Sequence, residues 1–468
     1  MNAALKKPQL RKSTGAVQKC IAGDCTAEYA INEPIYVCRK CGDPLEIDCR
    51  VEAFPDPLSL RQQWEARAAS RDPRDRSGVW RYREVLPFND NASIVTLFEG
   101  NTPIYDAPKC ALYAGLSSLT LKHQGNNPTG SFKDTGMTTA VTQAGILEAQ
   151  AVLCASTGNT AASLAAYAAR ANVKCAVLLP EGQISPAKLA QSMDYGAIIF
   201  EVEGNFDDCM RLTHELAEVP WIYIANSVNP FRIEGQKTVA YELMMQCDWR
   251  VPDHVVVPGG NMGNSSALGK GFDEMRRMKL IDRVPKLSVI QAEGAAPLAH
   301  LFAGFMKAGS TNEKLREAKI ETVAHPRTLA TAIKIGAPVS WKKALRAVIQ
   351  SQGNIISVNE QEMADAKAMI GLEGIGCEPA SAATVAGIKK LVAQNKIGRD
   401  ESVVGILTGH VLKDPDYVGH YHRGMLSLDF DVEGQGEKKV PIAGGFRNPP
   451  VRVMATKHAI IESLQRER

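Results

Sequence analysis

The stretch "LKHQGNNPTGSFKDTGM", Leu121 to Met137, determines the fold we expect and the place where we look for chemistry. An apolar strand pattern enters a loop of Gly, Asn, Thr and Ser, and an apolar helix pattern follows. Lys133 stands at this strand-to-helix junction. A partly desolvated lysine loses its proton readily, and its free amine then forms a Schiff base with a carbonyl cofactor. Position alone favours an ordinary solvated lysine, so three further segments decide between the two interpretations.

The first of these segments is "CASTGNTAASLAAYAARA". The apolar strand Ala151 to Ala155 runs into the hydroxyl-rich loop Ser156 to Thr160 and then into an alanine-rich helix. Hydroxyls and free backbone N–H groups at a helix N-terminus suit a carboxylate or a phosphate. An ordinary helix cap explains this segment equally well on its own.

The second segment, "HVVVPGGNMGNSSALGKGF", is a β-branched run, His254 to Val257, followed by a glycine-rich loop, 259–264. Glycine allows the backbone to approach a phosphate closely, and successive N–H groups form an anion nest. The loop is neither a P-loop nor a dinucleotide fingerprint, because the Lys-Ser or Lys-Thr pair and the glycine spacing are missing.

The third segment, "SVVGILTGHVLKD", is a buried-strand pattern that ends at Thr408. A hydroxyl at the carboxyl end of such a strand is well placed to meet a ring nitrogen lying over the sheet edge. A plain strand-end threonine is the more common case, so this segment also needs the others.

Together and in this order, the four segments resemble the fold-type II pyridoxal-phosphate enzymes and, among them, the threonine synthase family, especially its plant and bacterial branch. The similarity covers nearly the whole chain. It is carried by "TGSFKD", "ASTGNTA", "NSVNPFRIEGQKT", "PGGNMGN", "CEPASAA" and "LTGHVLKD". The resemblance implies an α/β fold of the tryptophan synthase β-like kind, with two open α/β lobes, parallel sheets, and pyridoxal phosphate between the lobes.

Strand and helix patterns alternate from about Ser118 to Gly409, which favours parallel βαβ units. With the resemblance, this alternation divides the chain into five parts. They are an N-terminal arm (1–16), a zinc-ribbon-like segment (17–50), a large cofactor-binding lobe (51–135 and 236–413), a small lobe (136–235) and a C-terminal extension (414–468) with a last helix, Lys457 to Arg466.

The zinc-ribbon-like segment contains Cys20, Cys25, Cys38 and Cys41, in the order C-x4-C, a gap, and C-x2-C. Two such pairs are typical of a tetrahedral structural zinc site. The first pair is wider than usual and Cys49 lies nearby as a substitute ligand. Both a structural zinc and a metal-free ribbon therefore remain open.

Composition excludes several classes of function. The chain has 468 residues, 45% apolar and 22% charged, and a net charge of +3, which describes a globular protein of two or three domains. So small a charge gives no reason to expect nucleic acid or membrane as a partner. The chain has no apolar run of membrane-spanning length and no signal-peptide core. We therefore expect a cytoplasmic enzyme, and the family implies a homodimer.

The resemblance implies roles for the cofactor-site residues. Lys133 would hold pyridoxal phosphate and move protons at the substrate carbons. Asn159 would bind the ring hydroxyl, and Thr408 would meet the ring nitrogen. A hydroxyl does not keep that nitrogen protonated as a carboxylate does, which makes the ring a milder electron sink. The residues matching the cofactor-phosphate loop are Gly260, Asn261, Met262, Gly263 and Asn264.

The resemblance also implies a substrate site. The residues matching the substrate-carboxylate loop are Ser156, Thr157 and Thr160, those matching the substrate-phosphate segment are Asn226, Ser227 and Arg232, and Lys188 is a further cationic candidate. Arg232 discriminates most, because a planar bidentate donor suits a phosphate dianion. The alternative for Arg232 is a surface salt bridge.

The implied reaction converts O-phospho-L-homoserine and water to L-threonine and phosphate by γ-elimination and β-hydration. One rival is a cysteate-synthase-like β-replacement on O-phosphoserine, whose substrate is one methylene shorter, a modest difference for a binding site. Another is a non-catalytic zinc-ribbon binding protein. Where the plant enzymes carry "CPHTG", this chain has "CEPAS", Cys377 to Ser381, as the bacterial form does, and S-adenosylmethionine activation is not predicted.

Overall fold

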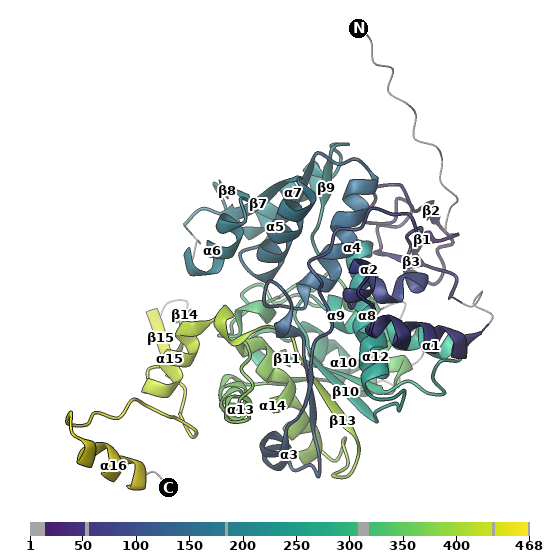
Figure 1. Ribbon diagram of the computed structural model, residues 1–468. Coiled ribbons are helices and arrows are strands. Elements are labelled where there is room, and N and C mark those ends of the chain that lie inside the picture. The colour runs from purple at the N-terminus through teal and green to yellow at the C-terminus, as the bar shows by residue number, and fades with distance from the viewer. Residues whose placement is uncertain (1–14, 52–55, 183–185, 308–317, 433–435, 467–468) are drawn as a thin grey trace.

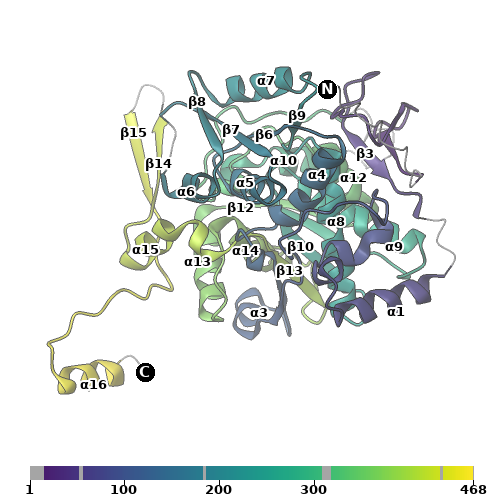
Figure 2. The same cartoon turned by 45° about the horizontal axis from the view of Figure 1, so that its top comes forward.

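A computed structural model describes residues 15–51, 56–182, 186–307, 318–432 and 436–466 of the chain (Figures 1 and 2). Most of the expected N-terminal arm (1–16) lies outside these ranges. Two α/β bodies, each built on its own mainly parallel sheet, make up the bulk of the molecule. This arrangement confirms the predicted fold class.

The larger sheet has the strand order β12-β11-β10-β13-β5-β4 among the described residues. Its strands are β4 (Ile104–Asp106), β5 (Thr120–His123), β10 (His254–Pro258), β11 (Lys286–Ala292), β12 (Ile355–Val358) and β13 (Val403–Leu407). All neighbours are parallel except the edge strand β4, which runs antiparallel to β5. Every residue of β10 is buried, as expected of a parallel strand covered on both faces.

Helices cover both faces of this sheet. Val255 and Val257 of β10 pack into one apolar cluster and Val256 into another, because successive side chains of a strand point to opposite faces. The first face is covered by α1 (Pro57–Ala68), α8 (Pro230–Gln246), α9 (Gly263–Arg277), α10 (Pro297–Lys307) and α12 (Trp341–Gln350). The second is covered by α3 (Pro108–Ala114), α13 (Glu360–Leu372) and α14 (Pro379–Ala393).

The smaller sheet is parallel throughout, in the order β8-β7-β6-β9. Its strands are β6 (Ala151–Ala155), β7 (Lys174–Pro180), β8 (Ile198–Val202) and β9 (Ile222–Ile224). Its helices are α4 (Lys133–Ile146), α5 (Asn159–Ala171), α6 (Pro186–Asp194) and α7 (Phe206–Leu216). The strand predicted from Ala151 to Ala155 is confirmed, and the small alanine side chains of α5 allow it to pack closely on that strand.

The described N-terminal segment is a three-stranded antiparallel sheet, ordered β2-β1-β3, of β1 (Val17–Cys20), β2 (Glu28–Ala30) and β3 (Leu45–Asp48). It contacts both larger bodies. Lys343 Nζ on α12 donates a hydrogen bond of 2.5 Å to the Leu45 carbonyl. On the other side, the backbone N–H of Ile224 in β9 donates a bond of 2.8 Å to the Tyr36 hydroxyl.

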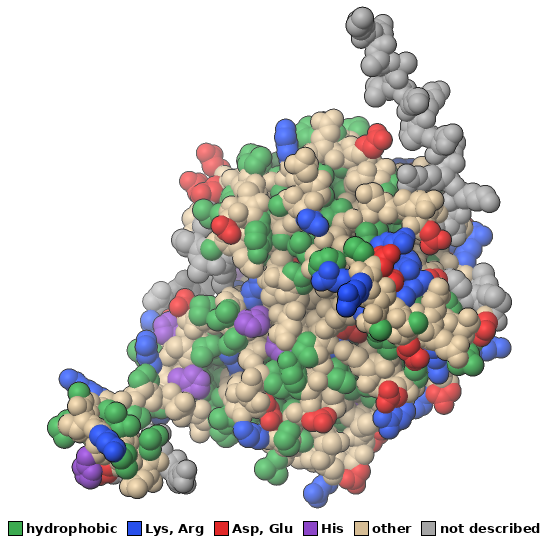
Figure 3. All heavy atoms as spheres, in the orientation of Figure 1, with side chains coloured by type: hydrophobic (Ala, Val, Ile, Leu, Met, Phe, Trp, Pro, Cys, Tyr) green, Lys and Arg blue, Asp and Glu red, His purple; other side chains and the backbone are tan. Residues whose placement is uncertain are grey.

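Beyond β13 the chain forms α15 (Pro415–Arg423), the hairpin β14 (Ser427–Val432) and β15 (Gly436–Pro441), and α16 (Lys457–Arg466). The last helix has the predicted bounds and stands apart from the body (Figures 1 and 2). It carries hydrophobic side chains on its surface (Figure 3), of which Ile460, Ile461 and Leu464 are exposed. Over the described ranges, no helix combines the length and the apolar character needed to cross a membrane.

Smaller elements complete the described fold. They are the short helix α2 (Pro73–Arg76) and the 3₁₀ turns η2 (Trp80–Val85), η3 (Gln124–Asn126), η4 (Glu293–Ala295), η5 (Thr331–Ile333) and η6 (Val411–Lys413). The loops that follow β5, β6, β10 and β13 all leave the carboxyl ends of parallel strands. Ligands of open α/β sheets bind at such ends.

Candidate active site

The loop that carries Lys133 is joined to the end of β13. The Phe132 backbone N–H donates to the Thr408 carbonyl at 2.9 Å, and the His410 N–H donates to the Gly130 carbonyl at 2.9 Å. Ser131 pairs with Gly409 between these two bonds. Two segments far apart in the sequence therefore form one unit around Lys133.

Lys133 is half-buried at the first position of α4. Its Nζ lies 4.2 Å from the centre of the Phe132 ring. Burial, with the positive charge of Arg232 nearby, lowers the pKa of Lys133 from 10.5 to about 7, and Glu378 opposes this shift. A large fraction of the amine is then neutral at neutral pH, as a nucleophile or proton acceptor needs.

Asp134, the next residue, holds the loop that carries Lys133 in place through hydrogen bonds. Its buried carboxylate accepts hydrogen bonds from the Thr129 N–H (2.7 Å), the Thr129 hydroxyl (2.6 Å) and the Ser163 hydroxyl (2.6 Å) of α5. Burial raises the pKa of Asp134 to about 6 against these bonds. Sequence reasoning missed this residue, although it stands inside the quoted "TGSFKD" motif.

Thr408 belongs to a buried polar group at the end of β13. Its hydroxyl lies 3.0 Å from the Ser381 hydroxyl and 3.2 Å from Glu378 Oε1. The other oxygen of Glu378 accepts a bond of 2.9 Å from Asn159 Nδ2, at the start of α5. Both residues predicted to hold the cofactor ring thus meet on Glu378, which sequence reasoning overlooked within "CEPASAA".

The glycine-rich loop after β10 ends at an open helix N-terminus. Met262, with φ of +64°, precedes the first residue of α9, and no side chain caps the helix. The free N–H groups of such a turn, which include those of Gly263 and Asn264, can bind an anion. Gly260 lies against the backbone of the Ala332 turn, where an added Cβ would approach the Ala332 carbonyl to 3.0 Å.

Asn261 and Ser227 lie together where the two bodies meet. Asn261 Nδ2 donates to Ser227 Oγ at 3.1 Å, and Asn261 Oδ1 accepts from the Val339 N–H at 2.7 Å. Asn226 behaves differently, since its amide oxygen and nitrogen bond the N–H and carbonyl of Ala155, each at 3.1 Å. Asn226 therefore holds the end of β6 in place, while the Ser227 hydroxyl faces Asn261.

Arg232 is only 1% exposed, on the first turn of α8. Its Nη1 donates to the Ala225 carbonyl at 3.0 Å, and its Nε has no hydrogen-bond partner within the described chain. No carboxylate of the described residues pairs with it, so the surface salt bridge is wrong. Burial lowers the pKa of Arg232 to about 10. A buried guanidinium with unused donors suits an anion.

The loop at the start of α5 holds the predicted residues Ser156, Thr157 and Thr160, all half-buried. Ser156 Oγ accepts from the Gly158 N–H at 3.2 Å, and no side chain caps α5. This uncapped helix N-terminus is a second place where an anion can bind. Lys188 falls on α6, but its side chain lies outside the part that the structure describes.

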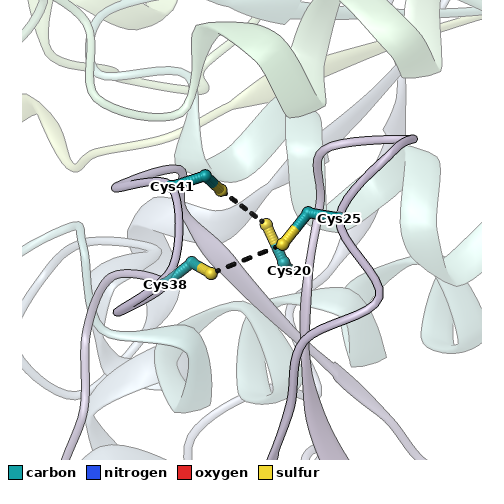
Figure 4. A group of neighbouring side chains, drawn as sticks. All are labelled: Cys20, Cys25, Cys38 and Cys41. Carbon is teal, nitrogen blue, oxygen red and sulfur yellow. Dashed lines mark hydrogen bonds between the residues drawn. The ribbon is translucent and has the colours of Figure 1, made fainter.

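Figure 4 shows the sulfur atoms of the four ribbon cysteines turned toward one another. All four lie within 4.8 Å of one another, with Cys20 3.4 Å from Cys41 and Cys25 3.7 Å from Cys38. A four-thiolate group suits tetrahedral zinc. Cys49 is not in this group, since its thiol donates to Glu234 at 3.3 Å instead.

Pyridoxal phosphate fits these surroundings on three observations. Lys133 offers an amine whose pKa is already lowered. The uncapped start of α9 offers N–H groups for a phosphate, and the buried Asn264 beside it has an Oδ1 with no partner in the described chain. Asn159 and Thr408 supply polar groups for a ring, close to the lysine loop.

Comparison with known proteins identifies the family. Residues 95–409 match the family of pyridoxal-phosphate dependent enzymes. The chain is 47% identical over 417 residues to a threonine synthase of Methanocaldococcus jannaschii, covering 89% of this chain and 97% of that protein. It is 44% identical to a threonine synthase of Methanosarcina acetivorans, covering 86% of this chain and 93% of that one.

A solved structure shares the fold. The processed form of threonine deaminase isoform 2 from Solanum lycopersicum superposes with a TM-score of 0.56 at 18% identity, covering 78% of this chain and 93% of that one. At this identity the likeness concerns the fold alone.

Proposed function

Since the chain belongs to the pyridoxal-phosphate-dependent enzymes, and within them to the threonine synthases, we propose that it converts O-phospho-L-homoserine and water to L-threonine and phosphate. It is thus a carbon–oxygen lyase acting on a phosphate ester. The observation that carries this substrate is Arg232, a buried guanidinium without a carboxylate partner among the described residues, close enough to Lys133 to lower that pKa. A substrate without its own phosphate would leave this charge uncompensated.

The cofactor would be held at several points. Lys133 would bind it covalently, the loop from Gly260 to Asn264 would hold its phosphate, Asn159 would bind its ring hydroxyl and Thr408 its ring nitrogen. When bound, pyridoxal phosphate supplies an electron sink that allows hydrogens on the neighbouring substrate carbons to leave as protons. The intact set of holding residues disfavours a non-catalytic ribbon protein.

Lys133 moves the protons. With cofactor and substrate bound, its neutral amine would take the proton from Cα and finally return it there, and it would move a proton from Cβ to Cγ, from which phosphate leaves. Its pKa of about 7 lets the same group accept and return a proton at neutral pH. Water then adds at Cβ. Asp134 does not contact the substrate. Its hydrogen bonds hold the loop that carries Lys133 in place.

The substrate is held at both ends. Ser156, Thr157 and Thr160, at the open start of α5, would take its carboxylate. Arg232 and Ser227 would take its phosphate, while Asn226 positions the segment by bonding Ala155. Lys188 remains a proposed further cationic residue for binding the substrate.

The four ribbon cysteines, Cys20, Cys25, Cys38 and Cys41, would bind a structural zinc. Their sulfurs converge as a tetrahedral site requires. The ribbon contacts α12 through Leu45 and β9 through Tyr36, so the metal would also stabilise contacts to both bodies.

We further propose a homodimer in the cytoplasm, without nucleic acid as a partner. The dimer is supported by the detached C-terminal helix, on which Ile460, Ile461 and Leu464 are exposed. The domain division we propose is the one expected from the sequence, with lobes of 51–135 plus 236–413 and of 136–235. Sedimentation of a Leu464→Glu variant tests the dimer, since a monomer at matched concentration is expected if α16 forms the contact.

The experiment that tests the substrate compares two phosphate esters on the purified protein supplied with pyridoxal phosphate. We expect threonine and phosphate in equal amounts from O-phospho-L-homoserine. Phosphate release only from O-phospho-L-serine with sulfite would move the assignment to β-replacement. If the protein binds the cofactor but releases phosphate from neither substrate, the proposed substrate is contradicted.

A further inference from the structure

Tyr36 projects from the ribbon-like segment into the small body. Its side chain lies in an apolar cluster with residues of β6 and β9, and its ring meets that of Tyr223 edge to face, with 5.9 Å between the ring centres. Ile35, the residue before it, packs instead within the ribbon, in a cluster with Cys20 and Cys38. These two neighbouring side chains therefore join the interior of the ribbon to the small body.

The Tyr36 hydroxyl completes the outer edge of the small sheet. β9 is an edge strand that pairs with β6 alone among the described strands, so N–H groups on its outer side have no strand partner. Ile224, which is 1% exposed, has such an N–H, and it donates to the Tyr36 hydroxyl at 2.8 Å. The direction of this bond is fixed, because a backbone N–H can only donate. Without the hydroxyl, a buried donor would have no acceptor.

The residues directly after Ile224 carry the proposed substrate-phosphate site. The Ala225 carbonyl accepts from Arg232 Nη1 at 3.0 Å, and Ser227 follows two residues later. Tyr36 therefore holds the backbone directly before the residue to which the Arg232 guanidinium is bonded. A shift of this backbone would displace the guanidinium and the Ser227 hydroxyl from the positions that a bound phosphate requires.

The ribbon is itself anchored on the large body. Three cationic side chains of α12 bond to the ribbon just after its second pair of cysteines. The bonds join Lys342 to Asp43 at 2.6 Å, Lys343 to the Leu45 carbonyl at 2.5 Å and Arg346 to Glu46 at 2.5 Å. In the sequence, the turn of Cys38 and Cys41 lies between these contacts and Tyr36 (Figure 4). The ribbon thus links α12 of the large body to β9 of the small body.

We propose that Tyr36 is a positioning residue through which the ribbon sets the affinity of the substrate-phosphate site. The inference rests on the proposed function, in which Arg232 and Ser227 bind the phosphate of the substrate. Tyr36 holds the Ile224 backbone against a ribbon that is fixed to the large body, and so keeps both groups in place in advance. Groups supported in this way bind more tightly, because less freedom is lost on binding.

The cofactor site does not share this support. Lys133 and Thr408 lie in the unit formed with the end of β13, and the glycine-rich loop 259–264 belongs to the large body. None of these residues bonds to Tyr36 in the described chain. Loss of the Tyr36 hydroxyl should therefore weaken phosphate binding and leave cofactor binding unchanged.

The test compares Tyr36→Phe with the wild type, both loaded with pyridoxal phosphate. The substitution keeps the ring and removes only the hydroxyl. We expect the dissociation constant of inorganic phosphate and KM for O-phospho-L-homoserine to rise about threefold to tenfold, as the loss of one hydrogen bond implies. We expect kcat and the affinity for pyridoxal phosphate to keep their wild-type values. Amide hydrogen exchange in a peptide covering 222–229 should become faster.

Gln143→Met is the matched control. Gln143 Nε2 on α4 donates to the Ile31 carbonyl at 3.0 Å, so this variant also loses one bond between the ribbon and the small body, but away from the substrate-phosphate segment. It should keep the wild-type affinity for inorganic phosphate. An equal loss of phosphate affinity in both variants would indicate a general loosening of the ribbon and would overturn the proposal.

A Tyr36→Phe protein with wild-type phosphate affinity also overturns the proposal, whatever its hydrogen exchange. So does a parallel loss of kcat, cofactor affinity and phosphate affinity, since that pattern indicates a purely structural role. Failure of the proposed function is a different result, in which the wild type itself forms no threonine from O-phospho-L-homoserine. Weaker binding of inorganic phosphate by Tyr36→Phe would then still support the role of Tyr36, because that measurement needs no turnover.

Discussion

The backbone N–H of Phe132 donates a hydrogen bond of 2.9 Å to the carbonyl of Thr408. This bond ties the residue before the reactive lysine to the residue proposed to meet the ring nitrogen. Lys133 and Thr408 therefore belong to one hydrogen-bonded unit. A bound ring held at both points would keep its orientation while protons are transferred, since well-supported catalytic groups are the ones that stay in productive geometry.

Replacing Lys133 with Ala should abolish threonine formation. General acid–base catalysis alone contributes about 10²–10⁴-fold, and the loss of covalent cofactor attachment adds to that. We expect no measurable threonine, with an unchanged circular dichroism spectrum. Lys174→Ala, at an exposed position of β7, is the matched control and should keep full activity. Appreciable turnover by Lys133→Ala would refute the role of this lysine.

The stability of the cofactor-free protein should rise with pH above neutrality because of Lys133. Its pKa is about 7 in the folded protein against an ordinary 10.5, so the unfolded chain binds more protons between these values. The free energy of unfolding then increases across this window and loses that gain as pH falls through about 7.

Urea unfolding at pH 7 and pH 9 measures this effect, with Lys133→Met as the comparison. The variant lacks the titrating amine and should show a flatter pH dependence than the wild type. Equal pH dependence in the two proteins would mean that Lys133 is not desolvated in the folded state.

Replacing Arg232 with Lys should weaken binding of the phosphorylated substrate. Lysine keeps the charge but not the planar pair of donors. Losing a hydrogen bond to a charged group costs about 1.5–3 kcal/mol, so we expect KM to rise about tenfold to a hundredfold. Inhibition by inorganic phosphate should weaken in parallel.

Arg67→Lys serves as the control for Arg232→Lys. Arg67 on α1 is similarly buried but pairs with Glu84 at 2.5 Å. This variant should lower stability and leave KM unchanged. An unaltered KM in Arg232→Lys would remove Arg232 from the phosphate site.

Cys38→Ser should lose a bound zinc and lower the unfolding temperature. The remaining thiolates no longer complete a four-coordinate site, and the folding free energy that metal binding supplies is lost. Elemental analysis should find about one zinc per wild-type chain, as a single four-thiolate group implies. Cys49→Ser, whose thiol instead contacts Glu234, should retain the metal. A metal-free wild type that is equally stable would favour the metal-free ribbon.

Much of the fold could be predicted from sequence pattern. The strand at Ala151 to Ala155 and the helix at Lys457 to Arg466 have the predicted bounds. The first is a continuous apolar run and the second is bounded by charged residues, so local pattern is sufficient for both. The convergence of the four cysteines also followed from their spacing.

Hydrogen-bond partners that come together only in the folded chain could not be predicted from local sequence pattern. Glu378 contacts Asn159 and Thr408, which come from two different loops, and nothing in its neighbourhood in the sequence indicates burial. Asp134 takes one donor from α5, and Asn226 uses its amide on Ala155. The one signal that the sequence offered for Glu378 was an acidic residue directly before a helix-starting proline, inside the quoted "CEPASAA" motif.

The most direct test of the account locates the lysine that holds the cofactor. Holoenzyme treated with borohydride fixes pyridoxal phosphate to its lysine, and peptide mass spectrometry then identifies the residue. We predict the added mass on Lys133 and its absence from Lys133→Ala treated in the same way. The same mass on Lys188, Lys413 or any other lysine would contradict the account.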